Sequence, residues 1–164
     1  MQRVISGKEE LYERIVRVVE DVLGEGVVGI VLFGSTVYMG RGRDIDILVV
    51  VDGEVEVREK LRLELEIAKR LRKAVGDLAF DIHVMDLNSF MQNLTPGSFL
   101  AGLALGYEVL LDRTNIEDKI LKFLQEMSKE RHILHNKYGT WDLSRYARIT
   151  LRIKKAKMKQ RHST

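Results

Sequence analysis

The chain has 164 residues, of which 45% are hydrophobic and 31% are charged, and its formal net charge is +3. This length can bury the core of one domain, and the composition excludes a disordered tail. The absence of cysteine excludes disulfides, thiolate catalysis and cysteine-bound zinc. No apolar run approaches the roughly 20 residues that cross a bilayer, and the first residues are not a signal peptide, so we expect a cytoplasmic protein.

The charge is unevenly distributed along the sequence. Residues 145–164 contain eight basic residues and no acidic one, which leaves 19 basic and 24 acidic residues in residues 1–144. The body is therefore mildly acidic and the C-terminal end is basic. A basic end of this kind indicates a polyanion or an acidic surface as a partner.

The first half of the sequence predicts alternating helices and strands. Apolar residues recur at helical spacing in two stretches, and β-branched residues gather in three short runs. The predicted helices end at Gly24 and Gly76, and the predicted strands are residues 27–33, 44–51 and 78–85.

The second half predicts one more strand among helices. Asp86 is the expected N-cap of a short helix, and two further helices are expected to begin at Thr95 and at a Thr114–Glu117 capping box. The expected ranges are helices over residues 86–93, 95–105, 114–134 and 141–161, and a strand over residues 107–111. We therefore expect an α/β (α+β) fold, with a small mixed sheet flanked by helices over residues 1–112 and a helical pair over residues 113–164.

Two carboxylates on the second predicted strand indicate chemistry. Asp44 and Asp46 are two residues apart, so both side chains leave the same face of the strand. Adjacent carboxylates repel each other and are costly to desolvate, and a bound hard cation such as Mg²⁺ is the simplest compensation. Asp81 lies on the polar face of the third predicted strand and can converge on the same place. Three carboxylates around one or two Mg²⁺ ions suit phosphoryl or nucleotidyl transfer.

Gly34 and Ser35 supply a candidate phosphate site beside these acids. A glycine after a strand lets the backbone approach a phosphate closely, and the amides and hydroxyl that follow can donate hydrogen bonds. Arg41 and Arg43, in the loop before Asp44, are further candidates for the same anion, although solvated loop charges are the simpler interpretation.

These residues together resemble the DNA polymerase beta-like nucleotidyltransferase superfamily, and the small size is similar to its minimal nucleotidyltransferases. The motif here reads Gly34-Ser35, eight residues, then Asp44-Ile45-Asp46, with Asp81 as the third acid. The resemblance covers about residues 8–112 and implies the nucleotidyltransferase fold. It implies that Gly34 and Ser35 bind the triphosphate and that Asp44, Asp46 and Asp81 bind two Mg²⁺ ions, with Asp81 also activating the acceptor.

The resemblance also implies a reaction and a partner. A nucleoside monophosphate, above all AMP from ATP, would pass to a hydroxyl with release of pyrophosphate. In the antitoxins that resemble this chain, the acceptor is a tyrosine of a HEPN toxin, so a protein partner or a second copy is expected to bind through residues 113–164. Residues 131–138 resemble the HEPN ribonuclease signature only in degenerate form, and we assign no ribonuclease activity to them.

Several bland interpretations stay open at this stage. Asp44, Asp46 and Asp81 can be exposed strand acids, and His83, on the same face as Asp81, can be a partly exposed histidine without a role. The basic C-terminal helix can simply pack on the body, or it can bind a protein or nucleic acid. The alternative function is a nucleotidyltransferase-like binding module with little or no catalysis, which acts through its C-terminal helices.

Overall fold

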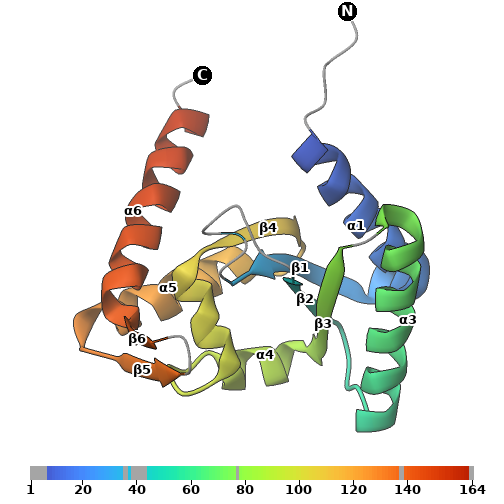
Figure 1. Cartoon of the computed structure of the whole chain (residues 1–164), viewed down its shortest axis with the longest axis horizontal. Coiled ribbons are helices and arrows are strands. Elements are labelled where there is room, and N and C mark those ends of the chain that lie inside the picture. Colours follow the sequence, from blue (N-terminus) through green and yellow to red (C-terminus); the bar gives the residue numbers. More distant parts are fainter. Residues whose placement is uncertain (1–6, 35–36, 38–43, 77, 137–138, 163–164) are drawn as a thin grey trace, which may run out of the picture.

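The computed structural model describes residues 7–34, 37, 44–76, 78–136 and 139–162 (Figure 1). Its centre is a four-stranded sheet in the order β3-β2-β1-β4. The strand β1 is antiparallel to both β2 and β4, whereas β2 and β3 are parallel. The strands are β1 (Val27–Phe33), β2 (Asp44–Val51), β3 (Ala79–Asp86) and β4 (Tyr107–Asp112). This confirms the expected small mixed sheet and its four strands.

Two helices, α1 (Gly7–Leu23) and α3 (Val57–Val75), cover one face of the sheet (Figure 1). Because β2 and β3 are parallel, the chain needs a crossover between them, and α3 is that crossover. Alternate residues of β2 point into this layer, where Ile45, Ile47 and Val49 are buried against α1 and α3. The period-two alternation expected from the sequence is therefore confirmed.

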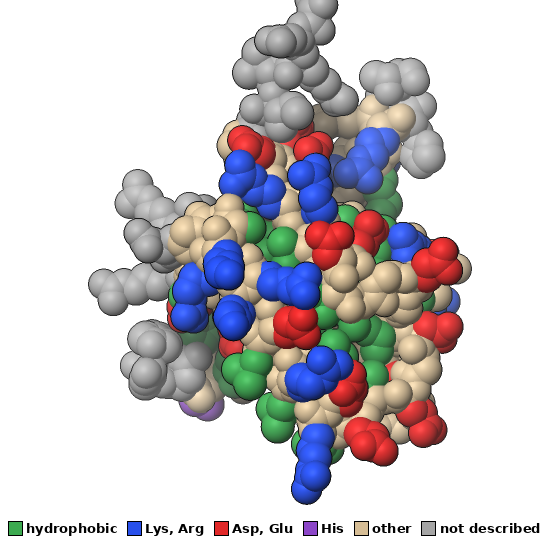
Figure 2. Space-filling view, turned by 90° about the vertical axis from the view of Figure 1, so that its right-hand side faces the viewer, with side chains coloured by type: hydrophobic (Ala, Val, Ile, Leu, Met, Phe, Trp, Pro, Cys, Tyr) green, Lys and Arg blue, Asp and Glu red, His purple; other side chains and the backbone are tan. Residues whose placement is uncertain are grey.

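The outer surface of α3 carries rows of charged side chains. Arg62 pairs with Glu59 and Glu66, and Arg70 also pairs with Glu66, at helical spacings of three and four residues. Figure 2 shows this side of the molecule, where acidic and basic side chains are interspersed with hydrophobic ones. Surface pairs of this kind add little stability individually.

The other face of the sheet packs against the second half of the chain. The covering elements are α4 (Leu87–Asn93), the 3-10 helix η2 (Phe99–Leu105), α5 (Ile116–Lys129) and α6 (Leu143–His162). Buried residues of α5 and α6 belong to the same core as Val31, Leu48 and Val50 of the sheet. The extension over residues 113–164 thus packs on the sheet, while its separation from the body at residue 112 stays a prediction.

A β-hairpin stands where the sequence predicts helix. The expected helix over residues 114–134 ends at Lys129, and β5 (Ile133–Asn136) pairs with β6 (Gly139–Asp142). The final helix consequently begins at Leu143 rather than at Trp141. Glu130 is extended, with φ −126° and ψ 155°, and this turns the chain out of α5.

Two expected helix starts are also wrong. Between Thr95 and Leu105 the helix is 3-10, it begins at Phe99, and the Ser98 side chain accepts its capping hydrogen bond from the Leu100 amide. The capping box at Thr114 does not form, because Asp112 instead accepts hydrogen bonds from the amides of Ile116 and Glu117. The expected N-cap at Asp86 is confirmed, since its carboxylate accepts from the Ser89 amide at 2.7 Å.

The helix α6 packs on the body from Leu143 to about Lys154, and its C-terminal end projects from the body (Figure 1). Ala147 and Leu151 are buried, and the Thr150 hydroxyl donates to the Ala104 carbonyl at 2.7 Å. Lys154 is also buried, with its ammonium 4.1 Å from the ring centre of Tyr107, and this burial lowers the pKa of Lys154. Among the described residues, no helix is both long and apolar enough to cross a membrane.

Candidate active site

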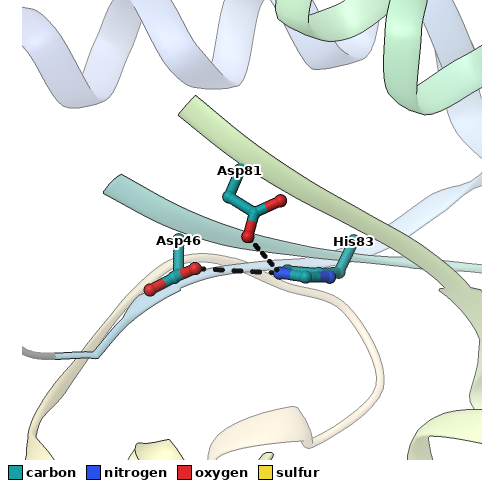
Figure 3. A group of neighbouring side chains, drawn as sticks. All are labelled: Asp46, Asp81 and His83. Atoms are coloured by element: carbon teal, nitrogen blue, oxygen red, sulfur yellow. Dashed lines mark ion pairs between the residues drawn. The ribbon is translucent and has the colours of Figure 1, made fainter. Parts of the chain in front are cut away.

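Two carboxylates and an imidazole meet on one face of the parallel pair β2 and β3. The register places Asp46 beside Asp81, and His83 follows two residues later on the same face. Nε2 of His83 lies 3.7 Å from Oδ1 of Asp46 and 3.4 Å from Oδ2 of Asp81. Figure 3 shows both carboxylates directed toward this nitrogen. The sequence expectation that Asp46 and Asp81 converge is therefore met in the structure.

The chemistry of this cluster suits a divalent cation. One ligand atom from each of Asp46, Asp81 and His83 lies within 4.8 Å of the others. Asp81 is exposed over 63% of its side chain and Asp46 over 33%, so an ion can reach both carboxylates. Carboxylate oxygens fit Mg²⁺, whereas an imidazole nitrogen suits transition metals better. For Mg²⁺ the two carboxylates are thus the fitting ligands, and His83 is their neighbour.

Gly34 approaches the cluster more closely than any other residue type could. Its backbone has φ +96°, and a Cβ atom there would lie 2.7 Å from Oδ2 of Asp46. The Gly34 amide donates to the Gly106 carbonyl at 3.3 Å, which ties the end of β1 to the start of β4. A glycine is therefore needed to bring the chain beside Asp46. Ser35, Arg41 and Arg43 lie outside the described residues.

Asp44 takes a different place from the other two acids. It is the first residue of β2, it is exposed, and it pairs with Ala79 in the parallel register. The described group that can hold a metal ion contains Asp46, Asp81 and His83, but not Asp44. A metal-binding role for Asp44 stays a prediction from the motif.

His83 is partly exposed, as one interpretation of the sequence has it, and it lies beside both carboxylates. Its side chain is only 24% exposed, and its ring centre lies 4.8 Å from that of Phe99 in η2, with the two rings tilted by 35°. The signal was present in the sequence, because residues 81 and 83 share a face of the strand. The sequence did not show that Phe99 lies against His83, because that contact depends on how η2 packs.

A pocket of about 360 Å³ lies over the cluster. It is lined by Gly34, Asp46, Asp81 and His83, and by apolar side chains of β1, η2 and the hairpin. A larger groove of about 700 Å³ lies between α1 and β4. Tyr12, Val16 and Leu110 are among the residues that line that groove, which lacks the carboxylate–imidazole cluster. The smaller pocket is the candidate active site because it contains the chemistry.

A comparison with protein families places the chain in a class of enzymes. The nucleotidyltransferase domain family matches residues 13–148, and the chain belongs to that family. By family it is a nucleotidyltransferase, as the resemblance in the sequence implies. A search of curated proteins gives no match.

Solved structures with a similar fold are distant in sequence. A toxin–antitoxin structure with AMP-PNP has 19% identity and a TM-score of 0.47, over 72% of this chain and 87% of that chain. A complex of tri-AMPylated Shewanella oneidensis HEPN toxin with MNT antitoxin has the same identity and TM-score, over 74% and 87%. Spectinomycin adenyltransferase AAD(9) from Enterococcus faecialis, with ATP and spectinomycin, has 16% identity and a TM-score of 0.47, over 73% and 65%. At such identities the likeness concerns the fold alone.

Proposed function

We propose that this chain transfers AMP from ATP to a hydroxyl of a partner protein, with release of pyrophosphate. The observation that carries the proposal is the meeting of Asp46, Asp81 and His83 beside Gly34, in a pocket that opens to solvent. Neighbouring carboxylates do not stabilise a fold unless a cation offsets their charge. The family supports the reaction class, and the convergence of these side chains supports their part in the proposal.

Each residue of the cluster has a distinct task in this proposal. Asp46, with Asp44 at the start of the same strand, and Asp81 would hold Mg²⁺, which supplies charge for the triphosphate and for the leaving pyrophosphate. Gly34 and Ser35 would bind the phosphates through backbone amides and the serine hydroxyl.

The proposed transfer is a displacement at the α-phosphorus of ATP. The acceptor oxygen forms a bond to the α-phosphorus, the bond from that phosphorus to the bridging oxygen breaks, and pyrophosphate leaves. The hydroxyl proton passes to the carboxylate of Asp81, the more exposed of the two acids. His83, 3.4 Å from that carboxylate, is a positioning residue for it.

The acceptor is proposed to be supplied from outside the chain. The pocket has room for one small ligand, and Asp81 faces solvent at its edge. An acceptor hydroxyl on a folded partner can reach this edge without entering the pocket. The product of the neighbouring gene, and a HEPN protein above all, is the acceptor to test first.

The test is transfer of label from ATP carrying ³²P at the α position. The chain is incubated with Mg²⁺ and with the neighbouring gene's product, total RNA, or neither, and labelled products are separated by size. Label on the protein partner that disappears in Asp46→Asn and Asp81→Asn supports the proposal, and label on RNA corrects the acceptor. No label on any acceptor, with no Mg²⁺-dependent binding of ATP, favours a binding module and contradicts the proposal.

A further inference from the structure

The active-site pocket has a second side that catalysis alone does not explain. Besides the carboxylates and His83, it is lined by five large apolar side chains from three separate segments. They are Phe33 of β1, Phe99 and Leu105 of η2, Leu134 of β5 and Trp141 of β6. Three of the five are aromatic, and two come from the hairpin that follows α5.

This apolar side is left partly open to solvent. Phe99 is 46% exposed and Leu134 is 41% exposed, although both are large hydrophobic side chains. The rings lie close to one another, because the ring centre of Phe99 is 6.3 Å from that of Phe33 and 4.8 Å from that of His83. The Trp141 ring packs against the Tyr146 ring of α6, with 5.8 Å between the ring centres. Exposed, prearranged rings beside a polar cluster are typical of a site for a planar ligand.

One molecule can satisfy both sides of the pocket. The volume of about 360 Å³ is near the lower end of the range for ligand sites, so a single small ligand fills it. That ligand must present negative charge to Gly34 and to cations at Asp46, and an apolar planar group to the rings. A nucleoside triphosphate carries both groups, whereas an acceptor side chain from a protein carries only one.

We infer that the aromatic side of this pocket, including Trp141 and Leu134 of the hairpin, binds the purine base of the nucleotide. This inference rests on the proposed function, because the phosphates must lie at Gly34 and Asp46. Bases stack on aromatic rings through their faces, with a strength that follows ring area. Among the described residues, the apolar side consists of Phe33, Phe99, Leu105, Leu134 and Trp141. Purines should therefore bind more tightly than pyrimidines.

The hairpin thus has a role beyond packing. It begins after α5, and Leu134 and Trp141 are directly opposite each other in its register. That pairing brings both side chains to the same pocket as the carboxylates of β2 and β3. Part of the extension over residues 113–164 is accordingly assigned to nucleotide binding.

The sequence offers a direct reporter for this inference, because Trp141 is the single tryptophan of the chain. The wild-type protein is titrated with a non-hydrolysable ATP analogue, and separately with inorganic tripolyphosphate, both with Mg²⁺. We expect saturable quenching of tryptophan fluorescence by the analogue, and binding of tripolyphosphate, measured by calorimetry, without comparable quenching. The base, rather than the phosphates, then contacts the indole.

Variants of the hairpin give the affinity. Trp141→Ala should raise the dissociation constant of the analogue at least about fivefold, and that of tripolyphosphate by less than about twofold. Trp141→Phe keeps a ring and should stay within about threefold of wild type. Leu134→Ser changes an exposed side chain and should weaken the binding of the analogue modestly. This variant replaces Trp141→Ala in the test if Trp141→Ala does not fold.

The outcomes separate this inference from the proposed function. If the analogue and tripolyphosphate both bind, but the analogue leaves the fluorescence and the Trp141→Ala affinity unchanged, the base lies elsewhere and only this inference fails. If Trp141→Ala binds nucleotide normally but loses transfer to the acceptor, the aromatic side belongs to the acceptor and the inference is overturned. If neither ligand binds, both the inference and the proposed function fail.

Discussion

Both faces of the central sheet contribute to a core, but they differ at the start of β2. On the face covered by α1 and α3, Ile45, Ile47 and Val49 are closed into an apolar core. On the other face, Asp46 and its neighbours Asp81 and His83 open into a pocket. Adjacent residues at this end of β2 thus lie in a closed core and in an open pocket, because the side chains of a β-strand alternate between its faces. Substitutions on the two faces should therefore have separable effects on activity and on stability.

The largest effect is expected on the pocket face, in activity. Asp46→Asn and Asp81→Asn should each lower the rate of nucleotidyl transfer by at least about 10²-fold, because each removes a charge that the proposed mechanism uses to hold the cation. Initial rates of label transfer measure this. Asp52→Asn, an exposed acid just beyond β2, is the matched control and should leave the rate unchanged. An Asp81→Asn variant with the wild-type rate would remove Asp81 from the proposed mechanism.

The next effect is expected on the core face, in stability. Ile47 is fully buried, so Ile47→Ala should lower the free energy of unfolding by about 2–5 kcal/mol. The rate per folded molecule should hardly change, since the Ile47 side chain does not reach the pocket. Urea denaturation followed by circular dichroism measures the loss. Leu61→Ala, on the exposed surface of α3, should cost less than about 0.5 kcal/mol.

Gly34 lies where the two effects are expected to combine. Gly34→Ala places a methyl group 2.7 Å from Oδ2 of Asp46 at a backbone φ of +96°. We expect a loss of about 1–3 kcal/mol in stability and a fall in transfer rate, because Asp46 has to move. Gly97→Ala is the control, since a Cβ atom there meets nothing within 4 Å. Full activity in Gly34→Ala would mean that the placing of Asp46 beside Gly34 is not needed.

The smallest effect is expected at the N-cap of α4. Asp86→Ala should cost about 1 kcal/mol, because the Ser89 amide loses its acceptor. That hydrogen bond holds the pKa of Asp86 below its usual value, so the contribution of the charged cap is present above the ordinary aspartate pKa of about 3.9. It is lost as the pH falls through the lower, folded-state pKa.

Denaturation of wild type and Asp86→Ala between pH 7 and pH 2 measures this cap. The difference in free energy of unfolding between the two proteins should become smaller as the pH falls toward 2. A difference in free energy of unfolding that stays constant with pH would contradict the role of the Asp86 carboxylate as the N-cap. Asp86→Asn, which keeps an acceptor oxygen, should lose less stability than Asp86→Ala.

Much of the sheet could be predicted from the sequence, because local alternation decides it. Periodicity alone puts positions 44 and 46 on one face of β2 and positions 81 and 83 on one face of β3. The glycine at 34 marks the turn after β1. The hairpin could not be predicted in this way. Apolar residues continue at helical spacing past Lys129, and the pairing of Leu134 with Trp141 is a contact between segments. The aromatic side of the pocket was therefore hidden, since three distant segments build it.

The central claim is that Asp46 stands in its strand to bind a cation and nucleotide, and not to hold the fold. Thermal unfolding of wild type and Asp46→Asn tests it most directly, first in EDTA and then with Mg²⁺ and a non-hydrolysable ATP analogue. In EDTA the melting temperature of Asp46→Asn should equal or exceed that of wild type, because carboxylate repulsion is relieved. With Mg²⁺ and the analogue, wild type should be stabilised and Asp46→Asn should not. A clearly lower melting temperature for Asp46→Asn in EDTA, or an unchanged stabilisation by ligand, would contradict the account.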